Sequence, residues 1–232
     1  MKILIAPNYY KGSLSAVKAA EVIESAIKTK NRAVSTVKCP LADGGDGTLD
    51  AVYATRGGTL INTRVHDPLG RKISAQWLKK DDTAIIEAAK ANGLSLLSAN
   101  EHNPFKTSTF GVGELIIDAI KSGCKKIILG VGGSSTNDGG IGALKALGIK
   151  FLDKSNQEIK DNVLELNKID KIDSINIFSK VFDTEIIVAT DVQNPLLGPN
   201  GASYTYAAQK GAKPTDLELL DKALSTFADK CG

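Results

Sequence analysis

Short apolar runs alternate along the chain with segments whose apolar residues recur at helical spacing. The apolar runs, which predict buried strands, cover residues 1–5, 34–37, 126–131 and 185–190. The segments with helical spacing cover residues 13–27, 48–55, 113–122, 139–147, 202–209 and 215–230. Ser13 is expected to cap the first of these helices. Strands that alternate with helices predict an α/β fold with a mostly parallel, Rossmann-like sheet and helices on both faces.

Residues 59–106 have a different sequence pattern from the rest of the chain. They begin with short β-prone runs, which are separated by turn sequences such as Asp67-Pro68-Leu69-Gly70. We therefore predict a smaller, β-rich α/β domain at 59–106, inserted into an α/β domain made of residues 1–58 and 107–232. Residues 153–183 are polar with weak helical spacing, and we expect a loosely structured connection there.

Charge and composition narrow the classes of partner. Lys plus Arg number 29 and Asp plus Glu number 26, without a basic run, so we expect no nucleic-acid partner. No run approaches the ~20 apolar residues of a membrane span, and the apolar stretch at the N-terminus is too short for a signal peptide. The three cysteines and two histidines are widely spaced, which favours neither a disulfide framework nor a zinc site. We therefore expect a cytoplasmic protein without a membrane partner.

Ligand sites in mostly parallel sheets lie beyond the carboxyl ends of the strands. The loop after the first predicted strand places Lys11 and Gly12 directly before the helix expected at Ser13. Backbone N–H groups at a helix N-terminus can hold an anion, and a lysine adds a point charge suited to phosphate. The alternative is a solvated lysine in a turn.

The loop after the second predicted strand reads Pro40-Leu41-Ala42-Asp43-Gly44-Gly45-Asp46-Gly47-Thr48. Glycines let the backbone approach a ligand closely, and carboxylates near phosphate usually imply Mg²⁺ between them. Asp43 and Asp46 are therefore candidate metal ligands. The alternative is a turn in which Asp46 or Thr48 caps the next helix.

The segment from Gly130 to Gly140 reads GVGGSSTNDGG and follows an apolar strand. Its small residues expose backbone donors that can surround phosphate oxygens, and five glycines are more than a purely structural loop would need. The candidate substrate- or nucleotide-binding residues are Gly130, Gly132, Gly133, Ser134, Ser135, Thr136, Asn137 and Asp138. The dinucleotide fingerprint would require glycine at Ser135, which disfavours a dinucleotide-dependent oxidoreductase, and the Walker A pattern is absent.

Asp191 closes the last predicted strand at the carboxyl edge of the sheet, and Asn194 follows it. A carboxylate there can accept a proton from a substrate hydroxyl or hold Mg²⁺, as phosphoryl transfer requires. The alternative is a turn former ahead of Pro195. Lys210, at the end of a later helix, adds either a cation near the site or only a solvated helix end.

Four segments together resemble the class I glycerate kinase family. They read APNYYKGSLSA, PLADGGDGTLDA, GVGGSSTNDGGIGALKALG and ATDVQNPLLGPNGAS. The resemblance implies transfer of a phosphoryl group from ATP to D-glycerate with Mg²⁺, on two α/β domains that close around a cleft. It places at this cleft Lys11, Asp43, Asp46, Asn137, Asp138, Asp191 and Asn194, with residues 130–136 around phosphate. Ser13, Gly44 and Gly45 are further candidates for binding the substrate or the nucleotide. By this resemblance Asp191 acts on the glycerate hydroxyl or its metal, Asp43 and Asp46 support Mg²⁺, and Lys11 neutralises phosphate charge.

Two departures from the family pattern bear on activity. The family usually has an acidic residue where this chain has Asn8 and a serine where it has Tyr9. Asparagine can hydrogen-bond but cannot act as a base or a strong Mg²⁺ ligand. The family also continues beyond the position of Gly232, so the chain is expected to lack the family's C-terminal part. These departures leave open a non-catalytic ligand-binding module, and the sequence also leaves open whether the chain forms a homo-oligomer.

Overall fold

The centre of the molecule is a five-stranded mixed sheet. The computed structural model describes residues 1–10, 12–160 and 162–231. The sheet has the order β3 (Thr59–His66), β4 (Lys72–Lys80), β5 (Thr83–Glu87), β6 (Lys126–Gly130) and β9 (Glu185–Ala189). Only β4 runs antiparallel to its neighbours, so β3, β5, β6 and β9 all point the same way. The prediction of an α/β fold with a mostly parallel sheet is confirmed.

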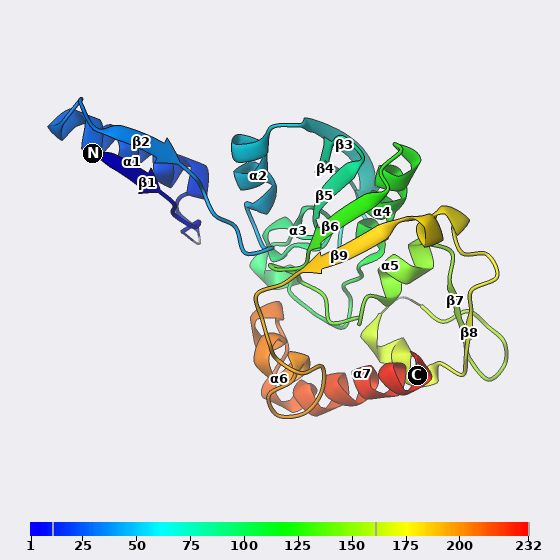
Figure 1. Cartoon of the computed structure of the whole chain (residues 1–232). Helices are drawn as coiled ribbons and strands as arrows, with labels where there is room; N and C mark the ends of the chain where they lie inside the picture. The colour runs from blue at the N-terminus through cyan, green and yellow to red at the C-terminus, as the bar shows by residue number, and fades with distance from the viewer. Residues whose placement is uncertain (11, 161, 232) are drawn as a thin grey trace.

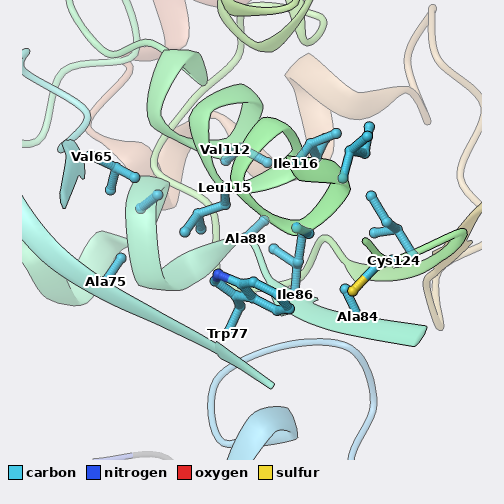
Figure 2. Close-up of a cluster of buried hydrophobic side chains, with 14 of the residues drawn as sticks. Val65, Ala75, Trp77, Ala84, Ile86, Ala88, Val112, Leu115, Ile116 and Cys124 are labelled. Atoms are coloured by element: carbon cyan, nitrogen blue, oxygen red, sulfur yellow. The ribbon is translucent and has the colours of Figure 1, made fainter. Parts of the chain in front are cut away.

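Helices cover both faces of this sheet because successive side chains of a strand point to opposite faces. Trp77 and Ile86 pack toward α4 (Phe110–Lys121) and its neighbour α3 (Ala89–Asn92), as Figure 2 shows. Leu78 and Ile85, one position away along the same strands, pack with Leu49 of α2 (Thr48–Arg56) on the other face. The alternation of buried residues along β4 and β5 thus fixes both helical layers.

The N-terminal unit is separate from this sheet. It consists of β1 (Lys2–Ile5), α1 (Ala16–Lys30) and β2 (Ser35–Lys38), and its two strands pair in parallel with each other. Figure 1 shows this unit projecting from the rest of the chain, to which the segment after β2 joins it. The helix begins two residues later than expected: its N-cap is Ser15, whose side chain accepts a hydrogen bond from the N–H of Lys18, so Ser13 as the cap was wrong.

The strands of residues 59–106 are continuous with the main sheet. β5 pairs in parallel with β6, so the hydrogen-bonded sheet crosses the boundary predicted between residues 106 and 107. The turn at 67–70 joins β3 to β4, where the sequence predicted it. Strand pairing alone does not define domains, and the division into domains stays a prediction.

A second cluster of buried apolar residues is packed around α7 (Leu217–Cys231). The other elements around it are α5 (Ile141–Ala146), β7 (Lys150–Leu152), β8 (Lys171–Asp173) and α6 (Ala202–Tyr206). Short 3₁₀ helices cover Val163–Lys168, Ser179–Asp183, Ala208–Lys210 and Pro214–Asp216. Val163 and Leu166 are buried against α7, so residues 153–183 are packed in part rather than loosely structured throughout. Among the described residues, no helix is both long and apolar enough to cross a membrane.

Candidate functional site

Loops that follow four strands meet around one cavity. Its volume is about 300 Å³, at the lower end of the range for ligand pockets. The residues lining it include Tyr9, Asp43, Gly45, Gly132, Gly133, Ser134, Thr190, Asp191, Tyr206 and Lys210. Asp43, Gly132 and Asp191 follow three different strands and share this cavity.

Two glycine-rich loops pack backbone against backbone beside the cavity. A Cβ atom on Gly130 would lie 2.5 Å from the carbonyl oxygen of Gly44, and one on Gly132 would lie 2.6 Å from Cα of Gly45. Gly44 has a φ of +89°, and its own Cβ would lie 2.6 Å from the carbonyl oxygen of Ala189. No side chain fits between these loops. Close packing of the two loops is therefore enough to explain glycine at positions 44, 130 and 132. From the sequence alone, phosphate binding was favoured over this structural explanation.

The backbone donors that remain for an anion belong to Gly133 and Ser134. The N–H of Gly132 donates to the carbonyl of Gly44 at 3.1 Å, and the N–H of Ser135 donates to the carbonyl of Asn92 at 2.8 Å. Within the described part of the chain, the N–H groups of Gly133 and Ser134 have no acceptor. Both residues line the cavity, so two donors of the predicted phosphate loop are available to a ligand there.

Carboxylates gather around Tyr9. Burial raises the pKa of its phenol, and the charges of Asp43, Asp46 and Asp191 raise it further. Asp46 is not among the residues lining the cavity; its carboxylate lies 3.3 Å from the position that a Cβ on Gly133 would take. Among the residues that the structure describes, no group of three or more His, Cys, Asp or Glu side chains could hold a metal ion. The predicted metal ligands therefore lie in one region without forming a complete ligand cluster.

Asp43 is oriented by its neighbours, whereas Asp191 is not. The side-chain amide of Asn8 donates to Asp43 Oδ2 at 3.2 Å, and the N–H of Gly45 donates to Oδ1 at 3.0 Å. Asn8 thus supports a carboxylate although it cannot supply one itself. Asp191 is exposed and accepts no hydrogen bond from the described residues, which leaves its oxygens open to a substrate or a metal.

Glu87 supports the loop that carries Asp43 and Asp46. It is 1% exposed at the end of β5 and accepts hydrogen bonds from the N–H groups of Gly47 (3.3 Å) and Leu49 (2.9 Å). Burial raises the pKa of its carboxyl, against the lowering effect of these hydrogen bonds. Sequence reasoning missed Glu87, although an acidic residue ending the apolar run TAIIE at a strand's carboxyl end was a usable signal.

Ser135, Thr136 and Asn137 turn into the protein. The hydroxyl of Ser135 donates to the carbonyl of Asn92 at 2.8 Å, and the hydroxyl of Thr136 accepts from the side-chain amide of Asn92 at 3.3 Å. The side-chain amide of Asn137 donates to the hydroxyl of Ser203 at 3.2 Å. Thr136 and Asn137 line a second cavity of about 290 Å³. These contacts shape the loop, and direct phosphate binding by the three residues stays a prediction.

Asp138 fastens the end of the same loop. It is 1% exposed, and Oδ2 accepts from the N–H (2.9 Å) and hydroxyl (2.7 Å) of Thr109 and from the N–H of Gly142 (3.3 Å). Oδ1 accepts from the N–H of Gly140 at 3.1 Å. Burial raises the pKa of this carboxyl, although all four donors lower it. Asp138 therefore fixes where the loop enters α5.

Of the remaining predicted site residues, Asn194 and Ser13 do not line the cavity, and Lys11 is not among the residues that the structure describes. Asn194 is held by its own loop and by α6: its amide donates to the carbonyl of Asn200 at 2.9 Å, and its Oδ1 accepts from the hydroxyl of Tyr206 at 2.6 Å. Ser13 lies in an exposed turn before α1 and does not line the cavity. Lys11, predicted as a catalytic cation, lies outside the described residues.

Comparison with protein families identifies relatives of the whole chain. The profile of the glycerate kinase family matches residues 3–232. The chain is 42% identical over 231 residues to a glycerate kinase of Bacillus subtilis, covering 99% of this chain and 60% of that protein. It is 43% identical over 231 residues to a glycerate 2-kinase of Escherichia coli, covering 99% of this chain and 61% of that protein.

A solved structure agrees with these sequence matches. A crystal structure from Salmonella typhimurium LT2, assigned as a glycerate kinase 2, superposes with a TM-score of 0.87 at 40% identity. The superposition covers 99% of this chain and 62% of that one. The chain thus spans about three fifths of the length of these relatives.

Proposed function

The chain belongs to the glycerate kinase family, and on this premise we propose that it transfers the γ-phosphoryl group of ATP to D-glycerate. The products are 2-phosphoglycerate and ADP. The observation that carries the proposal is the cavity that Gly133 and Ser134 share with Asp43 and Asp191. Phosphoryl transfer depends mainly on positioning and on stabilisation of charge. A cavity that combines free backbone donors with carboxylates meets both needs.

Asp43 and Asp191 are the proposed ligands of Mg²⁺. Proteins commonly bind Mg²⁺ through one or two carboxylates together with substrate phosphates, and these two carboxylates line the same cavity. When bound, Mg²⁺ would neutralise charge on the phosphates of ATP. Asp46 is proposed to contribute through its charge, since it also acts on Tyr9.

The chain's own groups take separate roles in this proposal. The N–H groups of Gly133 and Ser134 hold phosphate oxygens and keep the triphosphate in place. The oxygens of Asp191 have no protein partner in the described chain, so one of them is free to accept the proton of the attacking glycerate hydroxyl while the other is available to Mg²⁺. Lys11 is proposed to neutralise phosphate charge, as the family resemblance implies.

The family match does not favour the two alternatives considered from the sequence, a dinucleotide-dependent oxidoreductase and a non-catalytic binding module.

We also propose a cytoplasmic location. Its support is that Cys39, Cys124 and Cys231 are all free thiols, as expected of a protein in a reducing compartment.

The test is an assay of ADP formation by the 232-residue chain with and without D-glycerate and Mg²⁺. We expect ADP formation to require both, and Asp191→Asn to lower kcat by about 100-fold or more because the proton acceptor is lost. Asp229→Asn, which alters an exposed carboxylate on α7, is the matched control and should leave kcat unchanged. ADP formation that ignores glycerate would contradict the proposed substrate, and full activity of Asp191→Asn would remove Asp191 from the mechanism.

A further inference from the structure

Lys210 follows α6, and its side chain is buried. The residue is only 8% exposed, so the alternative of a solvated helix end is wrong. Burial lowers the pKa of its ammonium to about 8, and the charge of Asp138 offsets only part of this effect. In the described part of the chain Lys210 forms no salt bridge. Because a buried charge without a close partner destabilises a fold, an anionic ligand is a physical reason for a lysine at this position.

The ammonium of Lys210 is tied to the predicted phosphate loop. It donates to the carbonyl of Thr136 at 2.5 Å and to the hydroxyl of Ser134 at 3.1 Å. A lysine ammonium has three N–H donors. Across residues 1–10, 12–160 and 162–231, no third acceptor lies within hydrogen-bonding distance. One of the three N–H donors of the Lys210 ammonium therefore has no acceptor among the described residues.

The leftover donor belongs to a residue that lines the candidate cavity. Gly133 and Ser134, whose N–H groups also find no acceptor among the described residues, line the same cavity. Of the described residues lining it, Lys210 is the one lysine or arginine. Asp43 and Asp191 contribute negative charge, so a ligand with anionic oxygens needs a cation on the protein side as well as any metal.

We propose that Lys210 binds phosphate directly: its remaining N–H donates to an oxygen of the ATP triphosphate, next to the N–H groups of Gly133 and Ser134. This inference rests on the proposed function and adds a binding residue to it. The two hydrogen bonds of Lys210 to the loop also hold Ser134 and Thr136, so that one side chain both orients the loop and contacts the ligand.

The test is calorimetric titration of the 232-residue chain with ATP in the presence of Mg²⁺. Lys210→Met should weaken ATP binding by about 10- to 100-fold, the loss expected for one hydrogen bond to a charged group. Lys210→Arg keeps the charge and should retain more affinity than Lys210→Met. Lys222→Met, which removes an exposed charge on α7, should bind as the unchanged chain does. Unaltered affinity in Lys210→Met would overturn the proposal.

A pH comparison keeps the proposal testable if Lys210→Met does not fold. The titratable groups around Lys210 are the carboxylate of Asp138 and, across the cavity, the carboxylates of Asp43 and Asp191 and the neutral phenols of Tyr9 and Tyr206. The unchanged chain should lose about tenfold in ATP affinity between about pH 7.5 and 9.5, as the ammonium loses its proton, whereas Lys210→Arg should change little. Parallel pH profiles would overturn the inference. Absence of ATP binding by the unchanged chain would instead reject the proposed function.

Discussion

The buried ammonium of Lys210 predicts a specific dependence of stability on pH. Its pKa is about 8 in the folded chain, against 10.5 for an unperturbed lysine. Between these values the unfolded chain binds more protons than the folded chain, so the free energy of unfolding rises with pH. At about 1.36 kcal/mol per pH unit the whole rise is about 3 kcal/mol, of which about 2 kcal/mol falls between roughly pH 7.5 and 9.5.

Urea unfolding at several pH values measures this rise. The unchanged chain also carries other titrating groups, so the informative quantity is the difference in unfolding free energy between it and Lys210→Met. That difference should shift in favour of the unchanged chain by about 2 kcal/mol between roughly pH 7.5 and 9.5. Lys222→Met, which alters an exposed lysine, should follow the unchanged chain at every pH. If Lys210→Met also runs parallel to the unchanged chain, the ammonium is not desolvated and the reasoning fails.

Three further substitutions test the loops around the cavity. Asp138→Asn should lower the free energy of unfolding by about 2–4 kcal/mol, because an amide cannot accept all four hydrogen bonds. A urea midpoint within error of that of the unchanged chain would contradict this. Gly130→Ala should lower the free energy of unfolding by about 1–3 kcal/mol and weaken ATP binding, because the added Cβ would clash with Gly44. Unchanged stability and ATP binding would show that the two loops need not pack this closely. Glu87→Gln should raise the Mg²⁺ concentration needed for half-maximal activity by about tenfold, because one of the N–H groups of Gly47 and Leu49 loses its acceptor and the loop carrying Asp43 is held less firmly. An unchanged dependence on Mg²⁺ would count against this role of Glu87.

Patterns of local sequence were enough to predict most elements and part of the site. The apolar runs before Val131 and Thr190 became β6 and β9, because buried parallel strands are nearly continuous in apolar residues. The rule that ligands bind at the carboxyl ends of such strands directed attention to Asp43, Gly132 and Asp191, which do line one cavity. Family membership, expected from the resemblance of four segments, is confirmed by the match over residues 3–232.

The remaining features depend on long-range contacts that local patterns do not encode. Ser13 and Ser15 are equally good caps by composition, and only the backbone geometry before α1 selects Ser15. Gly130 and Gly132 are required by the approach of another loop, which was indistinguishable in sequence from a requirement of phosphate. Lys210 was ambiguous for the same reason, since its burial depends on the loop at 134–136 folding against it.

The most direct measurement is amide NMR of the 232-residue chain during titration with ATP and Mg²⁺. The N–H groups of Gly133 and Ser134, which line the cavity, should shift strongly, together with residues next to Asp43 and Asp191. Gly123, in the turn that leads into the amino end of β6, does not line the cavity and should not shift. Large shifts confined to other loops, with Gly133 and Ser134 unmoved, would contradict the assignment of this cavity to the triphosphate.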